Sequence, residues 1–166
     1  MATLNDESLA RRLRMLANHG REGKYEHELL GYNYRLDALQ AAILSVKLKR
    51  LAEWNAKRLD LARRYNAAFR GMDIVTPEAP DGHVFHLYVI RSKKREALQS
   101  ALKAEGISTG VHYPIPCHRQ PCCRQYNAPA LPVTERIAAE IVSLPLYPEM
   151  TAAQQDRIIA CLKRFA

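Results

Sequence analysis

The sequence predicts an α+β fold, and three observations predict it. Residues 36–70 carry apolar side chains at helical spacing with no proline among them. After this region, short stretches rich in β-branched and aromatic residues alternate with further helical stretches. The chain has 166 residues, of which 48% are hydrophobic, and this is enough to build one core. We therefore expect one long helix and a small sheet covered by helices.

The amino-terminal region predicts a helix followed by a long polar loop. The helix is expected from Glu7 to Asn18, with Asn5 or Asp6 as its N-cap and Gly20 beyond its end. The loop covers residues 21–34 and is longer and more polar than a simple connection needs. We expect it to have a functional or interface role.

The next region predicts a helix of unusual length. Its apolar positions include Leu39, Ile43 and Val46, and Gly71 follows its end. A lone helix over residues 36–70 is too long for a small domain. We therefore expect either a bend near Trp54–Asn55 or packing against something outside this chain.

The remaining elements are shorter. In chain order we expect strands at 73–76 and 84–91, a helix at 94–105, a strand at 107–111, a proline-rich loop at 112–132, a helix at 134–142, a strand at 143–146 and a last helix from 151. Thr151 and Gln154 form a capping box for this last helix. His86 and Tyr88 lie within the second predicted strand, and we expect both in the core.

Composition and charge argue against several classes of protein. The net charge of +8 is compatible with nucleic-acid binding, but acidic residues are interspersed with the basic ones, and no zinc-finger spacing or RNA-binding motif is present. We therefore expect no nucleic-acid partner. No apolar run reaches 18 residues, so no membrane span is expected. The start lacks a basic segment followed by an apolar one, so a cytoplasmic location without a signal peptide is expected.

The cysteines do not predict a metal site. Cys117, Cys122 and Cys123 cluster beside His118, but their spacing lacks the paired C-x2-C units of structural zinc sites. We expect free thiols here, and we expect Cys161 to be a core residue of the last helix.

The most informative segment is GYNYRLDALQAA, at residues 31–42. It resembles the GYNxRxDxxQAA segment of the DegT/DnrJ/StrS family of sugar aminotransferases, which are pyridoxal-phosphate enzymes with the fold of aspartate aminotransferase. Four further segments resemble family motifs in family order: they lie at residues 5–21, 86–91 (HLYVIR), 106–116 (GISTGVHYPIP) and 143–151 (SLPLYPEMT). The resemblance covers nearly the whole chain.

The resemblance implies a carboxy-terminal part of such an enzyme, with the small domain of a fold type I pyridoxal-phosphate enzyme. Residues 1–35 would be the tail of the large domain with a loop that crosses the dimer interface, residues 36–70 a connecting helix and residues 71–166 the small α+β domain. In this family the lysine that forms the Schiff base lies before the matching segment, and no lysine of this chain has the matching context. No catalytic residue is therefore assigned, and the chain is expected to be inactive alone.

The activity that the resemblance implies is transfer of an amino group from glutamate to a keto nucleotide-sugar, with pyridoxal phosphate as cofactor. The partners would be a second copy in a homodimer, or the missing large domain. The alternatives are a non-catalytic binding or assembly module, half of a split enzyme and, less favoured, a basic nucleic-acid-binding domain.

Asn33 and Arg35 are the candidate cofactor-binding residues. An amide NH2 and a guanidinium are good donors to phosphate oxygens, and a helix start nearby favours anions. The resemblance implies that Asn33 helps to hold the cofactor phosphate of the neighbouring subunit and that Arg35 lies near the same entrance. The simpler interpretation is an asparagine that suits the turn at a helix start and an arginine that is solvated there.

His112 and Tyr113 are the candidate substrate-binding residues. They follow a predicted strand and precede Pro114 and Pro116, which stiffen the loop. The resemblance implies that this loop lies at the mouth of the active site and contacts the nucleotide-sugar. The simpler interpretation is a histidine whose hydrogen bonds are satisfied at a strand end and a tyrosine buried against the prolines.

Overall fold

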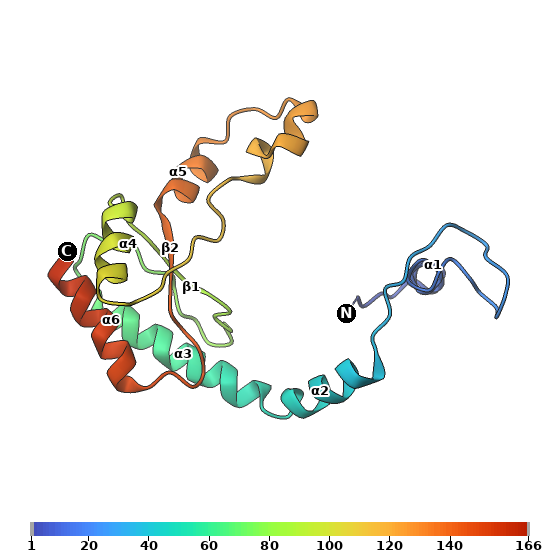
Figure 1. The fold of residues 1–166 in the computed structure, drawn as a ribbon, viewed down its shortest axis with the longest axis horizontal. Helices are drawn as coiled ribbons and strands as arrows, with labels where there is room; N and C mark the ends of the chain where they lie inside the picture. Colours follow the sequence, from blue (N-terminus) through green and yellow to red (C-terminus); the bar gives the residue numbers. More distant parts are fainter. Residues whose placement is uncertain (1, 166) are drawn as a thin grey trace. The chain divides into compact units, whose positions relative to one another are not determined.

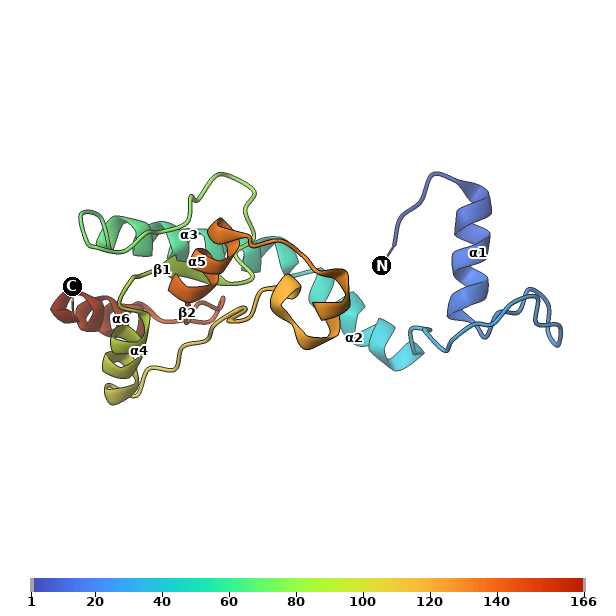
Figure 2. The same ribbon diagram turned by 90° about the horizontal axis from the view of Figure 1, so that it is seen from above.

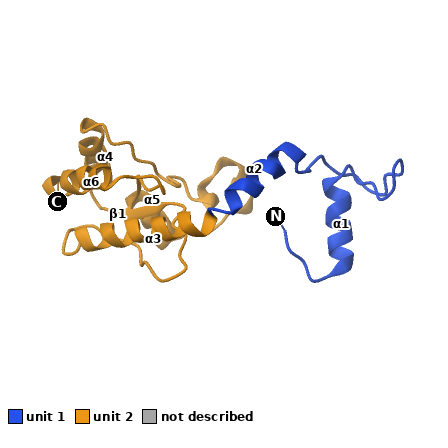
Figure 3. Cartoon of the chain, turned by 90° about the horizontal axis from the view of Figure 1, so that it is seen from below, with its two compact units in different colours: residues 1–50 blue, residues 51–166 orange. Residues whose placement is uncertain are grey.

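The computed structural model describes residues 2–165. The chain forms two compact units, residues 1–50 and 51–166 (Figure 3), and each is described by itself. The elements, labelled in Figure 1, are α1 (Glu7–Ala17), α2 (Ala38–Leu48), α3 (Leu51–Ala68), β1 (Tyr88–Arg91), α4 (Arg95–Ala104), the 3-10 helices η1 (Cys117–Arg119) and η2 (Pro121–Tyr126), α5 (Pro132–Glu140), β2 (Ile141–Leu144) and α6 (Ala152–Phe165).

The first unit contains α1, a long loop and α2. The predicted N-cap of α1 is confirmed, because the Asp6 carboxylate accepts a hydrogen bond from the Leu9 backbone N–H at 3.0 Å. The helix ends where His19 and Gly20 adopt positive φ angles of 60° and 74°. The loop then runs out beyond this end of α1 and returns past it (Figure 2).

The predicted long helical region is present as two helices rather than one. Its interruption lies at Lys49–Arg50, whereas Trp54–Asn55, where we expected a bend, lies inside α3. The densest basic run of the region consists of Lys47, Lys49 and Arg50. Because cations stabilise the carboxy-terminal end of a helix and not its beginning, this run favours an end to α2 at this point.

The sheet of the second unit has two antiparallel strands, β1 and β2. Tyr88 lies opposite Leu144, and the pairing continues to Arg91 opposite Ile141. One further residue is bridged to the outer edge of each strand. Val75 pairs with Arg91 of β1, and Gly110 pairs with Ser143 of β2. The predicted strands at 73–76 and 107–111 are therefore single bridges, and the strand predicted at 143–146 lies two residues earlier.

Strand β1 is shorter than predicted because the chain turns sharply just before it. Phe85 has a φ of 39°, a conformation that a strand does not allow. Tyr88 is fully buried, as expected. His86 is exposed, so our expectation that it lies in the core is wrong.

The core of the second unit lies between the sheet and the helices α3, α4 and α6. Its largest members form an aromatic cluster, in which the rings of Tyr65 and Tyr88 lie 4.9 Å apart and those of Tyr65 and Phe69 lie 5.4 Å apart. Both tyrosine hydroxyls donate hydrogen bonds, from Tyr65 to the Pro145 carbonyl at 3.0 Å and from Tyr88 to the Asn66 side chain at 2.6 Å. Burial raises the pKa of both phenols. The predicted α+β architecture is confirmed.

Helix α6 begins with the predicted capping box. The Gln154 N–H donates to the Thr151 hydroxyl at 3.2 Å, and the Gln154 side-chain oxygen accepts from the Thr151 N–H at 2.8 Å. No helix among residues 2–165 is long and apolar enough to cross a membrane.

Candidate cofactor and substrate sites

Asn33 lies in a short extended segment that pairs with the end of α1. The backbone N–H of Tyr34 donates to the Ala17 carbonyl at 2.8 Å, and Asn33 forms an antiparallel bridge with Asn18. On either side of Asn33, the rings of Tyr32 and Tyr34 stack with centroids 5.3 Å apart. These contacts hold the backbone of Asn33 in place although its side chain is exposed.

Two glycines make this pairing possible. A Cβ atom added at Gly31 would lie 2.1 Å from the Gly20 nitrogen, and one added at Gly20 would lie 1.6 Å from the Leu29 carbonyl oxygen. Real Cβ atoms do not come this close to backbone atoms, so both positions need glycine. The glycine that opens the motif therefore serves the close approach of two loop segments.

Arg35 orients the side chain of Asn33. Its Nε donates to Asn33 Oδ1 at 3.0 Å, and its Nη1 reaches Asn18 Oδ1 at 3.5 Å. The Asn33 amide nitrogen makes no hydrogen bond within the described part of the chain. The loop thus presents an amide NH2 and a guanidinium side by side, which are donors suited to an anion.

Asn33 and Arg35 precede helix α2 and do not lie in its first turn. Helix α2 begins only at Ala38, and its N-cap, Asp37, makes no side-chain capping hydrogen bond.

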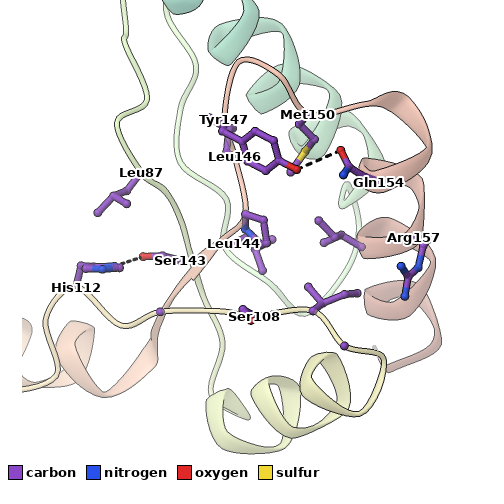
Figure 4. A pocket seen from close by; sticks show the side chains of 15 residues that line it. Leu87, Ser108, His112, Ser143, Leu144, Leu146, Tyr147, Met150, Gln154 and Arg157 are labelled. Atoms are coloured by element: carbon purple, nitrogen blue, oxygen red, sulfur yellow. Dashed lines mark hydrogen bonds between the residues drawn. The ribbon is translucent and has the colours of Figure 1, made fainter. Parts of the chain in front are cut away.

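His112 lines a pocket of about 470 Å³ in the second unit (Figure 4). Its Nδ1 lies 2.8 Å from the Ser143 hydroxyl oxygen. Tyr113 is not among the lining residues. Its side chain is 74% exposed, which excludes the expected burial against the prolines, and its ring meets that of His112 edge-on at 5.5 Å. The two rings are therefore in contact, but His112 lines the pocket whereas Tyr113 is exposed.

The pocket is formed by the ends of several elements. Arg157 of α6 lines one side and donates to the Glu105 carbonyl at 2.8 Å, while Tyr147 donates its hydroxyl to Gln154 Oε1 at 3.1 Å. No carboxylate, lysine or thiol is among the described lining residues, and the polar side chains there are those of Ser108, His112, Ser143, Tyr147, Gln154 and Arg157. The lining residues are Leu87, Gly106, Ile107, Ser108, Gly110, His112, Ser143, Leu144, Pro145, Leu146, Tyr147, Met150, Gln154, Arg157 and Ile158.

Sequence reasoning did not single out Ser143 or Arg157 as functional. Ser143 opens the SLPLYPEMT segment, and its position opposite Gly110 is a matter of register that no local pattern predicts. Arg157 is one of several arginines on amphipathic helices and carries no distinctive signal.

The loop that follows Tyr113 is closed by Glu135 of α5. One oxygen of this carboxylate accepts from His118 Nε2 at 2.9 Å, from Arg119 Nη2 at 2.8 Å and from the Leu131 N–H at 3.1 Å. The hydrogen bond from His118, followed by those from Leu131 and Arg119, lowers the pKa of Glu135 to about 2. The loop is thereby fastened at two points to the start of α5.

The four cysteines are free thiols, as expected. Cys161 is buried at 5% exposure, which confirms its place in the core. Cys122 and Cys123 lie on η2 with their sulfur atoms 3.9 Å apart. Among the described residues, no group of three or more His, Cys, Asp or Glu side chains is arranged to hold a metal ion.

The fold and these motifs define a portion of a sugar-aminotransferase-like protein. The DegT/DnrJ/EryC1/StrS aminotransferase family matches over residues 1–163, and the chain belongs to this family. Among curated relatives, it is 43% identical to a pleiotropic regulatory protein of Geobacillus stearothermophilus, over 99% of this chain and 46% of the relative. It is 41% identical to the dTDP-3-amino-3,6-dideoxy-alpha-D-galactopyranose transaminase of Aneurinibacillus thermoaerophilus, over 98% of this chain and 46% of that enzyme.

Solved structures confirm the expected fold. DesV of S. venezuelae, in complex with a ketimine intermediate, matches with a TM-score of 0.90 at 41% identity, over 96% of this chain and 44% of that one. NtdA of Bacillus subtilis, with bound cofactor PMP, matches with a TM-score of 0.88 at 33% identity, over 96% of this chain and 40% of that one. The chain therefore spans a little under half the length of the proteins it matches, and it corresponds to their carboxy-terminal part.

Proposed function

We propose that this chain supplies the carboxy-terminal part of a pyridoxal-phosphate-dependent enzyme that transfers an amino group from glutamate to a keto nucleotide-sugar. The observation that carries the proposal is the 41% identity to a sugar-nucleotide transaminase over 98% of this chain. Because the match covers only 46% of that enzyme, the lysine that binds the cofactor comes from the rest of the protein. In this arrangement residues 1–35 complete the large domain, residues 71–166 form the small domain, and residues 36–70 connect the two domains.

Asn33 and Arg35 are proposed to hold the cofactor phosphate of a neighbouring subunit. The fit rests on their chemistry and exposure, because an amide NH2 and a guanidinium form a donor pair on a loop whose backbone is fixed to α1. Pyridoxal phosphate, when bound, supplies the electron sink for amino transfer, and the protein supplies binding and orientation. The chain's own contribution is to bind the phosphate.

His112 and Tyr113 are proposed to contact the nucleotide-sugar. The edge-on pair of rings offers a polar ring edge and an exposed phenol on one loop. A nucleotide-sugar carries a negatively charged diphosphate, and the net charge of +8 favours its approach.

Helix α2 is proposed to pack against a second copy of the chain or against the missing large domain. It has no buried residue within the first unit. Exposed apolar patches of this kind mark interaction surfaces. The exposed apolar residues of this helix are Leu39 (74%), Ile43 (51%), Leu44 (53%), Val46 (66%) and Leu48 (67%).

A chimaera tests the proposed function. The carboxy-terminal part of the Aneurinibacillus transaminase is replaced by residues 1–166, and amino transfer from glutamate to its keto-sugar nucleotide, and to keto-sugars on other nucleotides, is measured. We expect transfer by the chimaera and none by the 166-residue chain alone. A folded, cofactor-loaded chimaera that transfers nothing would favour the alternative, a non-catalytic binding or assembly module.

A further inference from the structure

The ring of His112 occupies the space that a side chain at position 110 would take. Gly110 and Ser143 exchange two backbone hydrogen bonds, at 3.1 and 2.8 Å, which sets them directly opposite each other. Alternate residues of an extended segment share a face, so His112 lies on the same side as Gly110. A Cβ atom at Gly110 would lie only 2.6 Å from His112 Cε1. The absence of a side chain at position 110 thus lets the ring fold back toward β2.

In this position the ring reaches Ser143. The Ser143 residue is 5% exposed, and its hydroxyl oxygen lies 2.8 Å from His112 Nδ1 (Figure 4). A buried hydroxyl needs a partner, and a histidine at a strand end satisfies it. The bond has a second consequence, because rotation of the ring away from this position would break its contact with the buried hydroxyl.

We propose that Ser143 is a positioning residue for the substrate site: it holds the His112 ring in one rotamer, so that Nε2 is the nitrogen that meets the nucleotide-sugar. The inference rests on the proposed function in assigning the ligand, but the fixed ring is a property of this chain alone. Gly110 also contributes to this positioning, because only glycine leaves room for the ring against Ser143.

The consequence for binding is that a single polar atom of the substrate is matched to Nε2. An imidazole that is free to rotate presents Nε2 in several directions, and part of the free energy of each ligand contact is lost in selecting one of them. A ring already held by Ser143 avoids this cost.

The first experiment observes the ring directly, through the nitrogen chemical shifts of 15N-histidine-labelled protein, with His112→Gln to assign the signal. We expect the parent protein and Ser143→Thr, which keeps a hydroxyl, to show the Nδ1 shift of a nitrogen that is hydrogen-bonded to this hydroxyl. Ser143→Ala and Ser143→Val remove the hydroxyl, and Gly110→Ala pushes the ring away while leaving both partners present. In all three variants the Nδ1 shift should move away from the parent value. Gly23→Ala is the matched control, because a Cβ atom there meets nothing within 4 Å.

The second experiment reads the consequence in the complete enzyme or the chimaera. Loss of one hydrogen bond that orients a ligand contact should raise KM for the nucleotide-sugar about three- to tenfold in Ser143→Ala and Gly110→Ala, with kcat nearly unchanged. Ser143→Thr should keep the parent KM. Ser143→Val should not, because valine has the shape of threonine but lacks its hydroxyl.

The outcomes separate the two proposals. If His112 nitrogen shifts are the same in the parent, Ser143→Ala and Gly110→Ala, Ser143 does not position the ring, and the inference is overturned whatever the activity. If the shifts change as expected but KM does not, the ring is held for structural reasons only, and the inference is again overturned. If the parent enzyme shows no amino transfer, the proposed function fails, and the shifts still decide whether Ser143 holds the ring.

Discussion

Arg64 on α3 donates a hydrogen bond through Nη1 to the side-chain oxygen of Gln155 on α6, at 3.0 Å. Gln155 is fully buried, and its Nε2 donates to the Leu61 carbonyl of α3 at 2.8 Å. One buried amide therefore joins α6 to α3 through both of its polar atoms. A buried polar group satisfied in this way is costly to remove, because the Leu61 carbonyl and the Arg64 guanidinium each lose a hydrogen-bond partner.

We expect Gln155→Ala to lower the free energy of unfolding by about 2–4 kcal/mol, from the cavity and from the lost hydrogen bonds. Chemical denaturation of the 166-residue chain measures this change. Lys163→Ala is the control, because Lys163 is an exposed position of the same helix, where a change should cost less than about 0.5 kcal/mol. Equal stabilities of the two variants would show that the amide does not join the helices.

Glu135 predicts a stability difference that depends on pH. Because hydrogen bonds to His118, Leu131 and Arg119 lower its pKa to about 2 from 4.5, the folded state favours the ionised carboxylate. The resulting stabilisation is fully present above pH 4.5 and is lost as the pH falls toward 2. We expect the melting temperature of the parent to exceed that of Glu135→Gln above pH 4.5, with the difference shrinking toward pH 2. A difference that stays constant over this range would contradict the assignment.

The cysteines predict a graded reactivity with a thiol reagent. Cys117 and Cys122 are exposed, whereas Cys161 is buried and its thiol contacts the Ala101 carbonyl. The hydrogen bond with Cys122 raises the pKa of Cys123, so less of its thiolate is present at neutral pH. We expect two thiols to react quickly, Cys123 more slowly and Cys161 only after denaturation. Mass spectrometry of the labelled peptides identifies each site, and fast labelling of Cys161 in native protein would be contrary to its place in the core.

Much of the fold could be predicted because its signals are local. Asp6 caps α1, and Thr151 and Gln154 cap α6, and each of these signals lies within four residues of the helix it begins. The α+β class followed from the alternation of patterns after the long helical region. Strand lengths were overestimated because an apolar stretch does not show where its hydrogen bonds go. The backbone at Phe85, with its positive φ, delays the start of one such strand to Tyr88.

The candidate site could be predicted only in part, because only some of its signals are local in the sequence. His112 was found through a resemblance of its own segment, but its partner Ser143 lies 31 residues further along the chain. Only the register between residue 110 and β2 brings them together, and register depends on the packing of the whole sheet. Tyr113, expected either at the substrate or against prolines, is exposed, because the prolines beside it belong to a loop and not to the core.

Asn33 leads to the last prediction, which concerns the complete enzyme. Its backbone is fixed by the bridge to Asn18, whereas its exposed side chain makes one hydrogen bond within the described part of the chain, through Oδ1, with Arg35. Replacing the side chain should therefore leave the backbone pairing intact. In the 166-residue chain, Asn33→Ala should change the free energy of unfolding by less than about 0.5 kcal/mol.

In the proposed dimer of the complete enzyme, the same change should weaken the binding of pyridoxal phosphate by about 1.5–3 kcal/mol, the usual contribution of a hydrogen bond to a charged group. This corresponds to a dissociation constant raised about 10- to 150-fold, measured by titration of the apoenzyme with cofactor. Asn5→Ala, the same substitution at another exposed position, should leave the affinity unchanged. If Asn33→Ala unfolds the 166-residue chain and spares the cofactor affinity of the dimer, the side chain serves the loop through Arg35, and the phosphate is held by other residues.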